Sequence, residues 1–155
     1  TPGRLTLSRG FFIAFSAPLV ERAEKALRDR LNAARGLLPL AEIAAGLPRS
    51  ARPPGVPSAE PLLLALLRQL PDVLVTRDGR TGRADRAGGE LLREILAAGE
   101  APLRALVDSF NARLYPECRR GSGYVRDTLQ HDPLVRRPAP GRYALPGGLQ
   151  AGLPL

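Results

Sequence analysis

Two stretches of this chain present the same features in the same order. The first stretch contains residues 38–43 (LPLAEI) and 66–79 (LLRQLPDVLVTRDG). The second contains residues 101–106 (APLRAL) and 128–141 (TLQHDPLVRRPAPG), which have similar residue types in the same order. In both, a helical segment ends at Leu-Pro or Asp-Pro, and a β-rich pair with a glycine turn follows at once. The recurrence predicts an internal duplication into two units of about 70 and 60 residues. Because so short a unit buries little surface alone, each should need its neighbour for a stable core.

The first unit is expected to hold three helices and a hairpin. Apolar residues recur at steps of three and four in the long first helix, which gives one apolar stripe. Prolines exclude regular structure from residues 48–57, and Ser58 then has the position of an N-cap. The expected elements are helices over residues 17–35, 39–47 and 59–70, and a hairpin at the Asp78-Gly79 turn.

The second unit is expected to repeat this order. Ser122 is expected to cap its last helix, which Asp132-Pro133 should end, and Tyr143 should pack inward. The expected elements are helices over residues 88–99, 101–114 and 122–131, and a hairpin around 138–141. The whole chain then divides into an N-terminal arm or strand (1–17), a first unit (18–86), a second unit (87–146) and a flexible tail (147–155).

The charge balance favours a polyanionic partner. The chain has 155 residues and a formal net charge of +8, and Lys25 is its one lysine, so nearly all of the positive charge is arginine. Arginine suits bidentate contacts to phosphate and guanine. A GC-rich genome is the competing explanation for the ratio of arginine to lysine. Residues 116–142 carry six arginines against three acidic residues, a local net charge of +3.

The same composition argues against several functions. One cysteine, Cys118, and one histidine, His131, exclude an internal disulfide and a zinc site made of Cys and His alone. The serines, acids and His131 form no defensible catalytic group, so we expect no enzyme, no metal and no cofactor. Residues 11–20 are too short for a membrane span, and they run into residues 21–30 without a small-x-small cleavage site for a signal peptide. The single cysteine makes the reducing cytoplasm the simplest compartment. The chain begins at Thr1, which is compatible with a piece of a longer protein.

One segment carries a resemblance. LVRRPAPGRYAL, residues 134–145, resembles the last hairpin of bacterial winged helix-turn-helix units of the HARE type, with Gly141, Tyr143 and Leu145 in the expected places. The tandem arrangement is similar to helix-turn-helix units of sigma-factor-associated and restriction-associated bacterial proteins. The resemblance covers residues 90–145 well and 21–83 weakly. It implies a mainly α fold with small β-hairpins, built as two tandem winged helix-turn-helix units.

The resemblance also implies a DNA-binding site. Residues 121–131 become the recognition helix, where Arg126 would bind guanine and Gln130 would pair with adenine. Arginines of the hairpin would hold phosphates, as would those beside the positive N-terminus of the helix. The residues expected to contact DNA are Arg119, Arg120, Ser122, Tyr124, Arg126, Gln130, Arg136, Arg137 and Arg142, with Arg77 and Arg80 from the first unit.

These features predict a non-catalytic module for double-stranded DNA, either a transcriptional regulator or a DNA-docking domain. The alternative is a protein–protein interaction module of a larger transcription, defence or nucleic-acid-processing complex. The Leu62–Leu70 helix favours that alternative, because it is apolar around most of its surface and should pack against the second unit, a partner or a second copy. The long amphipathic Val20–Ala34 helix favours it as well. A third reading makes the chain a piece of a larger nucleic-acid enzyme.

Overall fold

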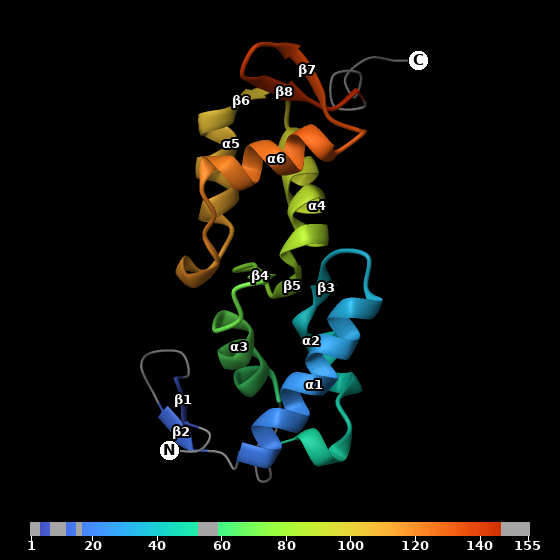
Figure 1. Cartoon of the computed structure of the whole chain (residues 1–155), viewed down its shortest axis with the longest axis vertical. Coiled ribbons are helices and arrows are strands. Elements are labelled where there is room, and N and C mark those ends of the chain that lie inside the picture. Colours follow the sequence, from blue (N-terminus) through green and yellow to red (C-terminus); the bar gives the residue numbers. More distant parts are fainter. Residues whose placement is uncertain (1–3, 7–11, 15–16, 53–58, 147–155) are drawn as a thin grey trace.

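The structure is a computed structural model, and it describes residues 4–6, 12–14, 17–52 and 59–146. The described residues are mainly helical, with six α-helices and short antiparallel strands (Figure 1). None of the helices in these ranges is both long and apolar enough to cross a membrane. The predicted cap at Ser58 and the predicted tail at 147–155 lie outside the described residues.

The same order of elements occurs twice along the chain. The first set is α1 (Ala17–Ala33), β3 (Leu38–Pro39), α2 (Leu40–Gly46), the 3-10 turn η2 (Arg49–Ala51), α3 (Glu60–Arg68), β4 (Val73–Val75) and β5 (Arg80–Arg83). The second set is α4 (Ala84–Leu96), β6 (Ala101–Pro102), α5 (Leu103–Ala112), η3 (Pro116–Cys118), α6 (Ser122–His131), β7 (Arg136–Ala139) and β8 (Arg142–Ala144). The two sets lie end to end along the long axis of the molecule (Figure 1).

The two sets also agree in backbone detail. Each has a three-stranded antiparallel sheet in which the last strand lies in the middle, in the orders β3-β5-β4 and β6-β8-β7. Gly79 and Gly141 end the hairpin turns with φ of 89° and 72°, a region that favours glycine. Their carbonyl oxygens accept equivalent hydrogen bonds, from the backbone N–H of Leu40 at 2.7 Å and of Leu103 at 3.0 Å.

Three local features differ from the prediction. The two-residue strands β3 and β6 were not expected, because they are too short to have a periodic pattern. α4 begins at Ala84, four residues before the expected helix, so it crosses the predicted unit boundary at 86/87. Ser122 is not the N-cap of α6; Gly121 holds that position and no side chain caps the helix.

The N-terminal arm forms a hairpin of its own. β1 (Arg4–Thr6) pairs antiparallel with β2 (Phe12–Ala14), with Leu5 opposite Ile13. The β1 backbone lies against α3, beside the first unit (Figure 1). The hairpin therefore lies against α3, which α1, α2 and β4 of the first unit also contact.

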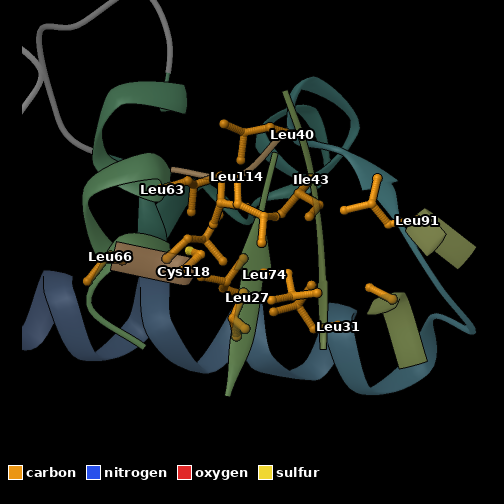
Figure 2. Packing of buried hydrophobic residues seen from close by; sticks show 14 of the residues in the cluster. Leu27, Leu31, Leu40, Ile43, Leu63, Leu66, Leu74, Leu91, Leu114 and Cys118 are labelled. Carbon is orange, nitrogen blue, oxygen red and sulfur yellow. The ribbon is translucent and has the colours of Figure 1, made fainter. Parts of the chain in front are cut away.

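A single hydrophobic core runs through both units. Figure 2 shows Leu27 and Leu31 of α1 close to Leu74 of β4, with Leu114 and Cys118 of the second unit packed among residues of the first. The backbone joins the units as well, since Tyr115 N–H donates to the Val75 carbonyl oxygen at 3.1 Å. The segment after α5 thus lies along the free edge of β4.

Helix α3 is buried by its own chain. Leu62, Leu63 and Leu67 are at most 1% exposed. α1, α2, β4 and β1 all lie against the helix. The prediction that the Leu62–Leu70 helix presents an apolar face to a partner is therefore wrong, because the fold has already covered that face.

Candidate nucleic-acid interface

Helix α6 presents a polar row on the surface of the second unit. It lies across α4 and α5 (Figure 1), and only Val125 and Leu129 of its ten residues are buried. Ser122, Arg126 and Gln130 recur at every fourth position, so they lie in one row on the exposed side of the helix. This row is open to a ligand, and Gly123, Asp127 and His131 are the other exposed residues of α6.

The hairpin that follows α6 adds two more exposed cations. Arg136 and Arg137 lie exposed at the start of β7, which is an edge strand of the second sheet. Tyr143 on the central strand β8 is 3% exposed, which confirms its predicted inward packing. The buried tyrosine fixes the hairpin to the core while the arginines of β7 remain in solvent.

Arginine side chains in the described ranges fall into two groups. In one group the guanidinium makes hydrogen bonds, ion pairs or ring contacts within the chain. In the other group no such contact to another described residue exists. The second group consists of Arg35, Arg49, Arg104, Arg119, Arg126, Arg136 and Arg137. Five of these seven belong to the second unit, and four of the five lie on or beside α6 and β7.

Arg120, which the sequence suggested for phosphate contact, makes several contacts within the chain. Its Nη2 donates to the Pro71 carbonyl oxygen at 2.7 Å and its Nη1 to that of Cys118 at 3.1 Å. The guanidinium also lies over the Tyr124 ring, 5.6 Å from the centroid. Because Pro71 belongs to the first unit, Arg120 links the two units.

Arg80 and Arg142 occupy equivalent strand positions, and both pair with a glutamate. Arg80 Nη1 lies 2.6 Å from Glu94 Oε2, and its hydrogen bonds to Glu94 and Asp78 raise the pKa of the guanidinium. Arg142 Nε lies 2.8 Å from Glu100 Oε2. Each pair neutralises a cation that the sequence had suggested for phosphate binding.

Arg77 also has partners within the chain. Its Nε donates to the Leu114 carbonyl oxygen at 3.2 Å, and its guanidinium lies 5.8 Å from the Tyr115 ring centroid. Arg68 lies over the same ring at 4.7 Å. Tyr115 therefore contacts two arginines where the units meet, so Arg77 serves the junction.

The side chain of Tyr124 holds α6 against α4 and α5. Its hydroxyl donates to the Ala84 carbonyl oxygen, and its ring lies 5.8 Å from that of Phe110. Burial raises the pKa of this hydroxyl. The side chain packs close to Gly88 of α4, so it positions the helix and does not extend into solvent toward a base.

The chain's one histidine, His131, and its one cysteine, Cys118, both lie in the second unit. His131 Nδ1 lies 2.8 Å from the Asp127 carbonyl oxygen in the last turn of α6. Cys118 is 2% exposed, and burial raises the pKa of its thiol. No cluster of His, Cys, Asp and Glu that could hold a metal occurs among the described residues.

An open hollow of about 460 Å³ lies between α4 and α6, on the side away from the polar row. It is lined by residues of both charges, among them Arg86, Arg93, Asp127 and Asp132. Arg93 pairs with Asp132 at 2.8 Å, and Arg86 Nη1 donates to the Asn32 carbonyl oxygen at 2.7 Å. Its arginines are thus already used within the chain.

No protein-family model matches this chain, and no curated protein matches it significantly. The structure brings six of the predicted site residues to exposed positions on one unit, where their side chains have no partner among the described residues. They are Arg119, Ser122, Arg126, Gln130, Arg136 and Arg137. The other five, Arg77, Arg80, Arg120, Tyr124 and Arg142, make internal contacts, and no local signal in the sequence separates the two groups.

Proposed function

We propose that this chain is a non-catalytic module that binds double-stranded DNA through α6 and β7. The observation that carries the proposal is a concentration of arginines, on and beside these two consecutive elements, that have no side-chain partner among the described residues. A cation that the fold does not use remains available for a phosphate, and phosphate contacts supply most of the affinity of DNA-binding proteins.

The fold supports a tandem winged helix-turn-helix arrangement. Each half has the order helix, strand, helix, helix, strand, strand, and its last strand lies in the middle of the sheet. In helix-turn-helix proteins, the recognition helix enters the major groove, which admits an α-helix. α6 is the third helix of its unit and the hairpin follows it, as the predicted recognition helix and wing require.

The side chains supply both kinds of contact that DNA recognition needs. Arg126 can donate two hydrogen bonds to guanine O6 and N7, and Gln130 can pair with adenine N6 and N7. Arg119, Arg136 and Arg137 would hold phosphates and so fix the register on the duplex. The uncapped N-terminus of α6 at Gly121 leaves backbone N–H groups beside Arg119, which favours a phosphate there.

The test is fluorescence anisotropy with a labelled mixed-sequence duplex across a salt series. A few phosphate contacts predict a slope of log affinity against log salt of about −3 to −5. Arg126→Ala should weaken binding to a preferred site by about 1–3 kcal/mol and leave mixed-sequence binding less affected. Absence of binding even at low salt would contradict the proposal.

A protein-interaction module is the second candidate, and it has lost its main support. The apolar α3 is buried, and Leu134 is the one large hydrophobic residue in the described ranges that is strongly exposed, at 53%. A single exposed leucine needs no partner to explain it. The cationic surface of the second unit therefore favours DNA over an apolar protein partner.

A further inference from the structure

We propose that only the second unit contacts DNA, so that one chain covers a single asymmetric site of about one helical turn, roughly 10 base pairs. The first unit would then hold the second unit in place and make no phosphate contact of its own. This inference rests on the proposed function and says which part of the chain performs it. Tandem units would otherwise suggest two contacts and a site about twice as long.

The equivalent helices of the two units differ in what they expose. Five of the nine residues of α3 are buried, against two of the ten residues of α6. Arg68, the cation of α3, pairs with Glu117, with Nε 2.9 Å from Oε2. The β1 strand lies against α3 as well, so α3 cannot enter a groove without the loss of its own packing.

The hairpins of the two units differ in the same way. In the first unit, Arg83 pairs with Asp85 at 2.9 Å and its Nη1 donates to Asn32 Oδ1 at 2.7 Å. Arg77 and Arg80 are held by Leu114 and Glu94. In the second unit, by contrast, Arg136 and Arg137 have no partner among the described residues.

The junction keeps the first unit from moving independently. A β-bridge joins Thr76 to Leu114, Arg77 N–H donates to the Arg113 carbonyl oxygen at 2.8 Å, and Arg120 reaches across to Pro71. The hydrophobic core is continuous across the same region. Because hydrogen bonds and buried apolar packing join the units here, a rotation of the first unit against the second would break these contacts.

The first experiment measures the site size on duplexes of about 12, 18, 24 and 36 base pairs, roughly one to three helical turns. We expect saturation at one chain per 10 or so base pairs, and an affinity that rises with length only as the number of overlapping registers rises. Saturation at one chain per 20 or so base pairs, with a steep gain in affinity between the two shortest duplexes, would overturn the inference.

Two matched double variants give a second measure on the full chain. Arg136→Ala/Arg137→Ala and Arg35→Ala/Arg49→Ala each remove two exposed arginines that have no partner in the described ranges. The first pair should make the salt slope shallower by about 2, since each lost phosphate contact is worth about 0.9. The second pair should leave both the slope and the affinity within error of the wild type.

The outcomes separate the two proposals. A shallower slope in the Arg35→Ala/Arg49→Ala variant would place the first unit on DNA and would overturn the single-unit inference while the proposed function stands. Failure of the wild-type chain to bind any of the duplexes would overturn the proposed function and this inference with it. Circular dichroism of each variant shows that a change in binding does not come from unfolding.

Discussion

Neighbouring residues of the same type have different roles in this protein. Arg119 and Arg120 are adjacent, yet the guanidinium of Arg120 donates to carbonyl oxygens of the junction and that of Arg119 has no partner among the described residues. A buried or half-buried carbonyl oxygen needs a donor. Arginine at position 120 therefore stabilises the fold. If an Arg120 variant bound DNA more weakly, lost packing and a lost DNA contact would explain the result equally well.

The close packing of Tyr124 depends on the absence of a side chain at Gly88. A Cβ at position 88 would overlap the Tyr124 hydroxyl. Gly88→Ala should therefore destabilise the protein by about 1–3 kcal/mol, although alanine is the better helix former. Tyr124→Phe alone should cost about 0.5–1.5 kcal/mol, because the hydrogen bond to Ala84 is lost. Urea denaturation of each variant measures these free energies of unfolding.

The double variant tests the contact itself. Removal of the hydroxyl relieves part of the overlap, so Gly88→Ala/Tyr124→Phe should lose less stability than the two single variants together. Gly123→Ala is a suitable control, since Gly123 is also helical and a Cβ there meets nothing within 4 Å. Strict additivity would show that α6 does not approach α4 at Gly88.

At the scale of elements, the segment between α5 and α6 completes the first unit. Leu114 bridges to Thr76, Tyr115 bonds to Val75, and Cys118 in η3 lies in the shared core. The corresponding turn in the first unit, η2, lies against α1 and makes no such crossing. The junction therefore depends on residues 113–120. This short stretch lies in the second unit along the chain, but its residues pack against both units.

Cys118 is a natural probe of this stretch, because the chain has one cysteine. Its thiol should react with an aromatic disulfide reagent far more slowly than a free thiol, since it is buried and burial also raises its pKa. Addition of urea should restore rapid reaction as the junction opens. Rapid labelling of the native protein would mean that η3 does not pack against β4.

At the scale of the whole molecule, the two units share one core. The buried cluster includes residues of every α-helix in the described ranges. Small domains with a single core usually unfold in one cooperative transition. The fold is therefore one folding unit in energetic terms, even though its element order is duplicated.

Unfolding by urea should accordingly give coincident transitions with two probes. All three tyrosines, Tyr115, Tyr124 and Tyr143, lie in the second unit, and the chain has no tryptophan. Tyrosine fluorescence thus reports on the second unit, while far-UV circular dichroism reports on the helices of both. A circular dichroism transition that persists after the fluorescence change is complete would show that the first unit folds on its own.

Much of the secondary structure could be predicted, because it depends on residues close in the sequence. The apolar repeats of α1 and α6, the prolines after α2 and the glycine turns at Gly79 and Gly141 all act locally. The limits of α4 and the short strands β3 and β6 could not be predicted. These two strands are defined by their pairing with β5 and β8, which are distant in the sequence. Ser122, Arg126 and Gln130 lie on the exposed side of α6, as helical spacing fixes, whereas Tyr124, which was also expected to face away from the core, packs against α4.

The duplicated order of helices and hairpins and the excess of positive charge can be read from the amino-acid order without the fold. Which arginines stay unpaired among the described residues depends on how the chain packs. Arg68 pairs with Glu117 and Arg142 with Glu100, 49 and 42 positions away. No local pattern records such pairs, because a guanidinium is neutralised by whatever carboxylate or carbonyl oxygen the fold brings within hydrogen-bond distance. The same physical reason explains why the apolar α3 is a core helix: its cover comes from elements distant in the chain.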